Sequence, residues 1–484
     1  MPTTNHSLPI DTSADAAAAI LRLAGELVLD HLSAGPNLPA MDTELAAAFL
    51  ADPAARRLPH EEGRPLRDAL DVVGRATRLG VNHASGKMLG FIPGSSLFLS
   101  AIADLISGVA NSYTGVSFGS PGMVALERDV LRWLCDTMGL PAGSAGILTS
   151  GGSLATVSAL LCARTDHLHG DLSGARIYLT GQTHYCVAKA ARIIGLPPSA
   201  LRTVGVDAAL RMDLDALRAA VEEDRAAGLQ PFCVVGTAGT TNTGAIDPLA
   251  GIAAVAREQK LWFHVDGAYG GFFRLTERGR ARLAGIDQAD SIVLDPHKGL
   301  FLPFGTGCLL VRDRAVLRRA HSAEDRVYLR DVADAEENDF ADISPELTRP
   351  NRGLRMWLPL QVHGVAAFRE ALDEKLDLAE LAYRRLSALP GISVLEAPQL
   401  SVLAFHCHGS DGTVEGDDRL TDQLVQQLNA SGAVFLSTTK LNGRVMARVA
   451  ALSLHTTRAM MEEALTAIAD QLAVLMAFSP RRRA

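Results

Sequence analysis

The sequence has few cysteines and no pair of cysteines at the spacing of a metal or redox site. The six cysteines stand singly, at positions 135, 162, 186, 233, 308 and 407. A disulfide framework or a cysteine-based zinc site needs such pairs, so neither is expected. Unpaired cysteines are typical of proteins that work in a reducing compartment.

The sequence also lacks a basic patch, a signal peptide and a long apolar run. The net charge is −8, and the one run of three arginines is the tail Arg481–Arg483, so nothing favours nucleic-acid binding. No Lys or Arg precedes Arg22, and Asp11 and Asp15 stand where a secretory signal would be apolar. The most apolar window, residues 88–110, is broken by a proline, an aspartate and several small residues, which makes it a poor membrane span. The sequence therefore predicts a cytoplasmic protein.

The hydrophobic pattern divides the chain into three parts, because its 484 residues exceed the size of a single core. Residues 1–80 are predicted to be helical, to lack a core of their own and to pack on a partner subunit. Residues 81–350 form the large part, in which short apolar runs alternate with helical stretches. This pattern predicts an α/β fold with a mostly parallel sheet flanked by helices. Residues 351–484 are predicted to hold a long linking helix and a small α+β domain.

Polar residues directly follow the expected strands of the large part. Strands are predicted at 145–149, 176–180, 232–238, 261–265, 291–295 and 307–311, with helices at 154–164, 185–194, 213–227 and 249–259. Because ligands of such sheets bind at the carboxyl ends of the strands, a functional site is expected there. Outside the large part, helices are predicted at 14–32, 354–388, 418–431 and 457–476, and strands at 392–396, 401–408 and 444–452.

Two of the polar segments that follow predicted strands also begin predicted helices. In Ser150–Ser153, glycines and hydroxyl groups lead into a helix, whose N-terminus either binds a phosphate group or is simply capped. His184 starts a second helix, where a capping role is the more common one and a functional role the alternative.

Two further segments carry charge into an apolar setting. Asp266 ends a strand, so it needs a cationic or hydrogen-bonding partner, and the small residues after it leave room for a flat ligand; the alternative is a turn cap. Lys298 follows another strand, where a crowded apolar site would lower the pKa of its amine and make it a nucleophile. The alternative for Lys298 is a surface side chain with a buried stem.

One ligand needs all four features, and it is pyridoxal 5′-phosphate. Its aldehyde forms an imine with a lysine, its ring nitrogen needs a carboxylate to stay protonated, and its phosphate suits a helix N-terminus. The order SGGS, THYCVAKA, GTTNTGAID, HVDGAY and DPHK resembles the group II pyridoxal-phosphate-dependent amino-acid decarboxylases, which include the aromatic-L-amino-acid, histidine and glutamate decarboxylases. The likeness extends from about residue 75 into the C-terminal part. It implies the aspartate-aminotransferase-like fold, with a seven-stranded sheet in the large domain.

The resemblance also implies roles for individual residues. Lys298 matches the lysine that holds the cofactor, Asp266 the partner of its ring nitrogen, and His184 the imidazole stacked on the ring. The remaining cofactor-site positions are Gly152, Ser153 and Thr241 on the phosphate side, Ala268 against the ring, Asp295 nearby, and His297 beside the lysine.

On the substrate side, the resemblance implies a closing loop at about 320–345, whose Tyr328 returns a proton to the α-carbon. Arg448 matches an arginine that can meet the substrate carboxylate, and Arg352 is a weaker candidate that a salt bridge explains equally well. Phe91, Pro93 and Gly94 match pocket positions and favour an aromatic or apolar L-amino acid. Relatives are homodimers with the active site at the interface, which is expected here too.

Some features leave alternatives open. Gly299 stands where relatives often have Trp, and Ala84-Ser85-Gly86 where they often have His-Pro, so the resemblance leaves the shape of the pocket open. A decarboxylation-dependent oxidative deaminase would use the same cofactor residues, although His184 and Tyr328 argue against it. A transaminase or other lyase fits the motifs poorly. A non-catalytic binding protein is opposed by the intact lysine and aspartate.

Two histidine pairs resemble metal ligands without completing a site. They are HLH at 167–169 and HCH at 406–408, and neither has a second ligand pair at convincing spacing. No metal site is therefore expected.

Overall fold

A seven-stranded sheet forms the centre of the computed structural model, which describes residues 10–42, 44–53, 61, 63–322 and 339–478. The strand order is β3-β9-β8-β7-β6-β4-β5, and only β9 runs antiparallel to its neighbours. The strands are β3 (Ala145–Thr149), β4 (Ala175–Thr180), β5 (Leu201–Val204), β6 (Gln230–Thr237), β7 (Trp262–Asp266), β8 (Ser291–Leu294) and β9 (Gly307–Val311). The prediction of a mostly parallel sheet is confirmed.

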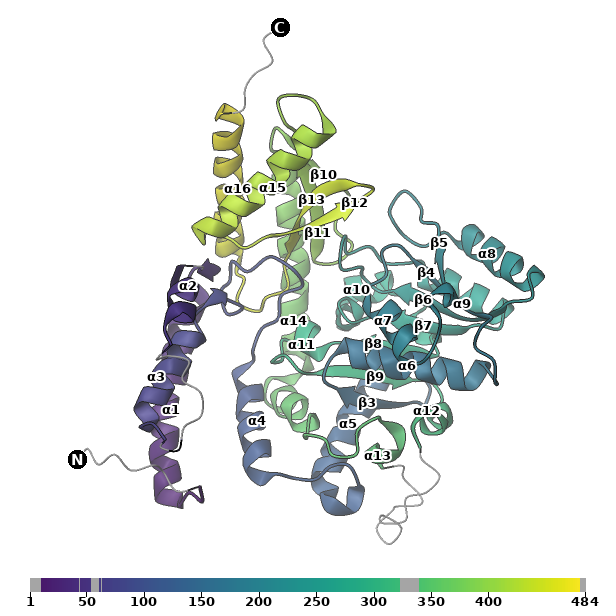
Figure 1. Ribbon diagram of the computed structural model, residues 1–484, viewed down its shortest axis with the longest axis horizontal. Helices are drawn as coiled ribbons and strands as arrows, with labels where there is room; N and C mark the ends of the chain where they lie inside the picture. The colour runs from purple at the N-terminus through teal and green to yellow at the C-terminus, as the bar shows by residue number, and fades with distance from the viewer. Residues whose placement is uncertain (1–9, 43, 54–60, 62, 323–338, 479–484) are drawn as a thin grey trace.

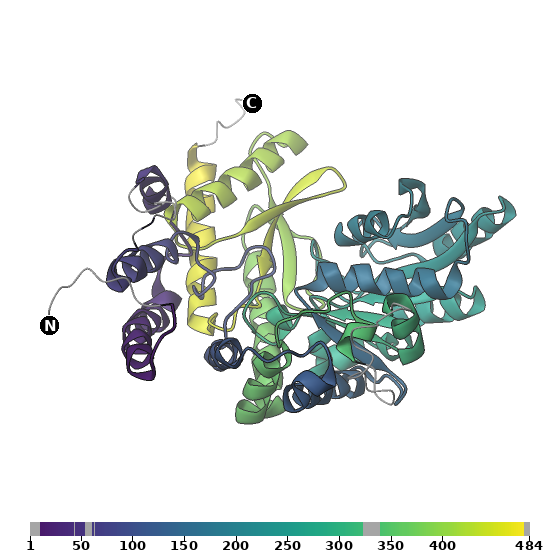
Figure 2. The same cartoon turned by 60° about the horizontal axis from the view of Figure 1, so that its bottom comes forward.

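Helices cover this sheet because its inner strands are apolar along their whole length. All residues of β7, β8 and β9 are buried, so both faces of these strands need cover. In Figure 2 the helix α6 lies across the sheet, where it contacts five of the strands. The helices of this part are α4 (Phe98–Ala110), α5 (Pro121–Met138), α6 (Gly152–His167), α7 (Cys186–Ile193), α8 (Leu214–Ala226), α9 (Leu249–Glu258), α10 (Glu277–Arg282), α11 (Pro296–Gly299), α12 (Arg314–His321) and α13 (Phe340–Ile343).

The long helix α14 (Gly353–Ser387) connects this part to a smaller C-terminal unit (Figure 1). Gly364, with a φ of 72°, interrupts the helical geometry of α14, which is otherwise continuous as predicted. The C-terminal unit is an antiparallel sheet of order β10-β11-β13-β12. Its elements are β10 (Ile392–Val394), β11 (Val402–Cys407), α15 (Val414–Ser431), β12 (Ser437–Leu441), β13 (Arg444–Ala450) and α16 (Arg458–Phe478).

The N-terminal helices lie beside the C-terminal unit, away from the large sheet (Figure 1). They are α1 (Ala14–Ala34), α2 (Glu44–Ala51) and α3 (Leu66–Ala76), and the two-residue strands β1 (Met41–Asp42) and β2 (Gly80–Val81) pair with each other. Neither α1 nor α3 has a buried residue. In a single chain these two helices therefore contribute no residue to a buried core.

One edge strand in each of the two larger sheets was not predicted from the sequence. β5 and β12 lie at the edges of their sheets, and each has exposed or half-buried residues along much of its length. Edge strands are often short and polar, so they lack the apolar run that marks an inner strand.

Among the described residues, no helix has the length and apolar character needed to cross a membrane.

Candidate active site

A cavity of about 300 Å³ lies where β3, β4, β6, β7 and β8 end. Since β7 lies between β6 and β8 and runs parallel to both, their carboxyl ends meet at one edge of the sheet. All the residues predicted from the sequence to contact a cofactor line this cavity: Gly152, Ser153, His184, Thr241, Asp266, Ala268, Asp295, His297 and Lys298.

Lys298 is held by an ion pair with Asp295. Its Nζ lies 2.8 Å from Oδ2 of Asp295, and only 4% of the aspartate side chain is exposed. Burial lowers the pKa of Lys298, but the attraction of Asp295 and then of Asp266 outweighs it, so the pKa is raised above its ordinary value. The lowered pKa expected from the sequence is therefore wrong, because the sequence did not reveal that Asp295 pairs with the amine.

Asp295 also lies against the N-terminus of α6. A Cβ atom at Gly152 would lie 3.0–3.3 Å from the carboxylate atoms of Asp295, so glycine allows the helix to begin this close. The partial positive charge of the helix N-terminus stabilises the carboxylate, as the ammonium of Lys298 does. Oδ1 of Asp295 is buried and has no hydrogen-bond partner in the described part of the chain. A ligand in the cavity would thus meet an unused acceptor.

His184 presents an uncharged ring to the cavity. Its Nδ1 accepts a hydrogen bond from the backbone N–H of Cys186 at 3.3 Å, which places the ring proton on Nε2. Burial lowers the pKa of His184, and Lys298 lowers it further, while Asp266 and Asp295 oppose them. The imidazole is therefore neutral at neutral pH.

Asp266 and His297 are oriented by backbone groups. Asp266 is the last residue of β7 and is 6% exposed, and its Oδ1 accepts from the N–H of Ala268 at 3.1 Å. Nδ1 of His297 donates to the carbonyl oxygen of Thr306 at 2.6 Å. Burial lowers the pKa of His297 in spite of Asp295. Both side chains are thereby fixed at the cavity wall.

Arg448 is buried beside the cavity without lining it. It donates from Nε to the carbonyl of Asn242, from Nη1 to Oγ of Ser437, and from Nη2 to the carbonyls of Phe91 and Thr241. Four of its five N–H groups are thus used by the chain itself. One N–H on Nη1 is left for a substrate carboxylate, so this predicted role stays a prediction.

The predicted pocket segment at residues 91–94 does not line the cavity either. Phe91 has a φ of 53°, and its side chain is 54% exposed. A bulky residue in this backbone region carries strain of about 1–3 kcal/mol unless its surroundings hold it there. Here Ser437 accepts from the N–H of Phe91 at 2.9 Å and Arg448 binds its carbonyl. Pro93 and Gly94 are buried.

Arg352 and Tyr328 are the two remaining residues that the sequence offered for the substrate side. Arg352 forms a bidentate pair with Glu346, at 2.7 and 2.9 Å, so the salt bridge considered for it is confirmed. Tyr328 lies outside the described residues, and its predicted role remains a prediction.

Several residues of the cavity wall were not predicted from the sequence. They are Thr156, Cys186, Thr237, Gly239 and Tyr269. Cys186 and Gly239 belong to the motifs THYCVAKA and GTTNTGAID, and Tyr269 ends the motif HVDGAY, whereas Thr156 and Thr237 lie outside the quoted motifs. Tyr269 has a further role. Its hydroxyl accepts from the backbone N–H of Ser401 at 2.7 Å and so joins the cavity wall to the C-terminal unit.

Gly299, whose effect on the pocket the sequence left open, packs against a core residue. It does not line the cavity, and a Cβ atom there would lie 2.6–3.0 Å from the side chain of Phe272. The glycine therefore makes room for the buried aromatic side chain of Phe272.

Comparisons with known proteins assign the family. Residues 60–408 match the pyridoxal-dependent decarboxylase conserved domain. The aromatic-L-amino-acid decarboxylase of Bacillus atrophaeus is 32% identical over 441 residues, which cover 90% of this chain and 91% of that protein. The L-2,4-diaminobutyrate decarboxylase of Rhizobium meliloti is 31% identical over 438 residues, covering 90% and 83%. The structure of Catharanthus roseus tryptophan decarboxylase in complex with L-tryptophan shares the fold, with a TM-score of 0.87 at 23% identity and coverage of 96% and 100%.

The chain therefore belongs to the pyridoxal-dependent decarboxylase family, as its motifs indicated. It is a pyridoxal-phosphate-dependent amino-acid decarboxylase. The cavity fits this cofactor on its own evidence, because it combines a lysine amine, a helix N-terminus free of side chain at Gly152, and the unused acceptor of Asp295.

Substituting Gly299 with Ala should destabilise the protein. The added methyl group overlaps Phe272, and overpacking of this kind costs about 1–3 kcal/mol. The midpoint of denaturant unfolding should therefore fall. A Gly299→Ala variant as stable as the parent protein would contradict this packing argument.

Substituting Asp295 with Asn should move the reactivity of Lys298 to lower pH. The neutral amine is the reacting form, so cofactor capture by cofactor-depleted protein should accelerate as the pH rises. Without the carboxylate charge, the pKa of Lys298 should fall, so the rising part of this profile should shift to lower pH. Stopped-flow absorbance of the bound cofactor measures the rate, with the surface substitution Asp215→Asn as control. Coincident profiles for the parent and Asp295→Asn would show that the ion pair does not set the pKa.

Proposed function

We propose that the substrate of this decarboxylase is an aromatic or apolar L-amino acid, released as its amine and carbon dioxide. The observation that carries the proposal is that one cavity brings the reactive groups together. Lys298 and its partner Asp295 line this cavity with His184, Asp266 and the start of α6. The aromatic-L-amino-acid decarboxylase relative supports an aromatic side chain over an acidic one. The apolar segment around Phe91 supports it through its match to the family's pocket positions, although this segment does not line the cofactor cavity.

Each cavity residue has a proposed task towards the cofactor. Pyridoxal phosphate, when bound, supplies an electron-accepting ring for the bond that loses carbon dioxide. Lys298 would hold it covalently through Nζ, and Asp266 would keep a proton on the ring nitrogen. His184 would cover one face of the ring with its neutral imidazole, and Ala268 is small enough to leave space for the ring.

The phosphate would be bound by the start of α6. The backbone N–H groups of Gly152 and Ser153 belong to the first turn of this helix, where no helical partner uses them. Thr241 and His297 would complete the cofactor site. Arg448 binds the carbonyls of both Thr241 and Phe91. It would therefore link the phosphate side of the site to Phe91, which the resemblance assigns to the substrate side.

The proton that replaces carbon dioxide at the α-carbon is assigned to Tyr328. This assignment rests on the match of its sequence to the family motif alone.

The neutral state of His184 suits ring stacking, since a charged imidazole would repel the protonated ring that Asp266 maintains.

The substrate and outcome can be tested with a panel of the twenty common L-amino acids. Carbon dioxide, amine and peroxide should be measured together. Aromatic amino acids should give carbon dioxide and amine without peroxide, because His184 and Tyr328 are both present. Lys298→Ala should lose the visible absorbance of the bound cofactor and all turnover. Peroxide with aldehyde would instead support oxidative deamination, and turnover confined to acidic or basic amino acids would refute the proposed side chain.

The chain is also proposed to form a homodimer with the active site at the interface. Apolar side chains are exposed on two helices: Leu21, Val28, Leu29 and Leu32 on α1, and Phe98, Leu105, Ile106 and Val109 on α4. Monomeric proteins rarely expose large contiguous apolar patches, and a second copy of the chain would cover them. The family resemblance supports the same assembly.

Analytical ultracentrifugation should give twice the 51.3-kDa mass of one chain. The pair of substitutions Ile106→Glu and Val109→Glu should shift the protein to monomer and abolish activity. Val474→Glu, at an exposed apolar position on α16, is the matched control and should leave the dimer intact. An active monomer would refute the interface site.

A cytoplasmic location is proposed as well. The six cysteines are all buried free thiols, which suits a reducing compartment.

A further inference from the structure

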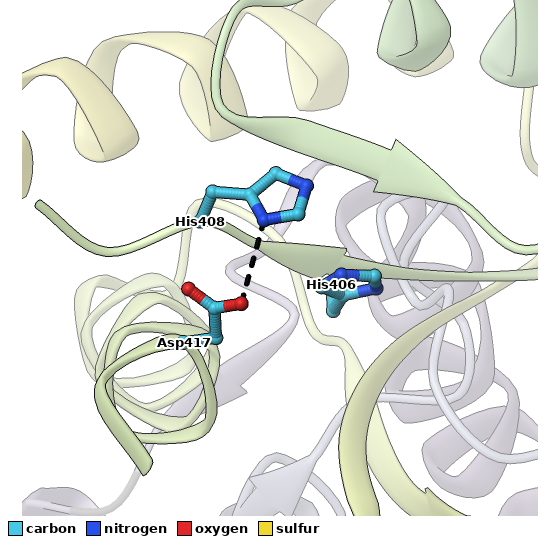
Figure 3. A group of neighbouring side chains, drawn as sticks. All are labelled: His406, His408 and Asp417. Atoms are coloured by element: carbon cyan, nitrogen blue, oxygen red, sulfur yellow. Dashed lines mark ion pairs between the residues drawn. The ribbon is translucent and has the colours of Figure 1, made fainter. Parts of the chain in front are cut away.

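A second group of polar side chains lies in the C-terminal unit, on other elements than those that form the cofactor cavity. His406 lies on β11, His408 directly follows that strand, and Asp417 belongs to the first turn of α15 (Figure 3). One potential ligand atom from each residue lies within 4.8 Å of the others. The sequence indicated the two histidines, but only the fold brings the carboxylate to them.

The spacing of these groups suits a small divalent cation. His406 and His408 are two positions apart, so they emerge on the same side of the strand, and their ring centres are 4.7 Å apart. Nδ1 of His408 lies 3.4 Å from Oδ2 of Asp417, the pair joined by the dashed line in Figure 3. Two ligands of a tetrahedral zinc ion, each at about 2.0–2.1 Å, are separated by roughly this same distance.

Neighbouring groups orient two of the three ligands. Nε2 of His408 lies 2.7 Å from Oγ of Ser393, and donation there leaves a lone pair on Nδ1. Oδ1 of Asp417 accepts from the N–H of Gly409 at 2.7 Å, so Oδ2 is the oxygen directed at the histidine. Outer partners of this kind are characteristic of metal-binding histidines and carboxylates.

His406 supplies an independent sign of an incomplete site. Its Nδ1 is buried and has no hydrogen-bond partner among the residues that the structure describes. A buried ring nitrogen without a partner is costly unless water or an ion satisfies it. Cys407, between the two histidines, is fully buried in the core on the other side of the strand and is not available as a ligand.

Arg444 competes with a cation at this place, but only in part. Its Nη2 lies 3.0 Å from Oδ2 of Asp417, while its Nε lies 3.1 Å from Oδ1 of Asp418. The second carboxylate therefore offsets the positive charge of the arginine. A carboxylate oxygen has two lone pairs, so Asp417 can keep Arg444 and still bind an ion.

We propose that His406, His408 and Asp417 bind one divalent transition-metal ion, zinc in particular, with a fourth position open to water. The ion joins the end of β11 to the start of α15 and stabilises the C-terminal unit. It takes no part in decarboxylation, because its ligands lie on none of the segments that line the cofactor cavity.

The test is a calorimetric titration of the chelator-treated holoenzyme with zinc chloride. One ion should bind per chain, and His408→Ala and Asp417→Asn should each weaken binding at least tenfold. His169→Ala removes an exposed histidine elsewhere and is the matched control, with unchanged binding expected. Arg444→Gln should tighten binding, since it removes the competing charge.

Thermal unfolding gives a second readout. Zinc should raise the melting temperature of the parent protein and of His169→Ala, but not that of His408→Ala. Decarboxylase activity with and without zinc should be equal. Absence of zinc binding, or equal binding by His408→Ala, Asp417→Asn and the parent, would overturn the proposal.

Discussion

The ion pair between Lys298 and Asp295 is the constraint on which the active site depends. A lysine this close to the core needs a carboxylate, and that carboxylate needs donors of its own. The start of α6 provides favourable charge at Gly152, and the ammonium of Lys298 pairs with Oδ2 of the carboxylate. As a result, the segment after β8 and the turn after β3 are fixed against each other. The groups proposed for the amine and for the phosphate of the cofactor are therefore positioned by one carboxylate.

Much of the large sheet could be predicted from the sequence because its inner strands are apolar and end in polar residues. All six predicted strands are present, and parallel pairing alone explains why Asp266 and Asp295 share an edge. β5 and β12 could not be predicted, since edge strands are half exposed and carry no continuous apolar run. The cofactor-site residues followed from short motifs at strand ends, where position and chemistry coincide.

Contacts between individual side chains could not be predicted from the sequence. The raised pKa of Lys298 depends on a partner only three residues away, yet a turn had to bring it into contact. Gly299 left the shape of the pocket open, whereas its tight contact in the structure is with Phe272. Asp417 reaches the two histidines of β11 only because α15 begins beside the end of that strand. In each case the missing information was the direction of a side chain.

The hydrogen bonds of Arg448 have a consequence for how the molecule unfolds. One guanidinium binds the loop after β6, the segment before α4 and the first residue of β12, which belong to three separate parts of the chain. Separating any one of these parts would remove at least one acceptor from a buried cation, which destabilises the opened state. The large domain and the C-terminal unit are thus coupled through one side chain, and this coupling favours a single cooperative transition over independent melting of the two.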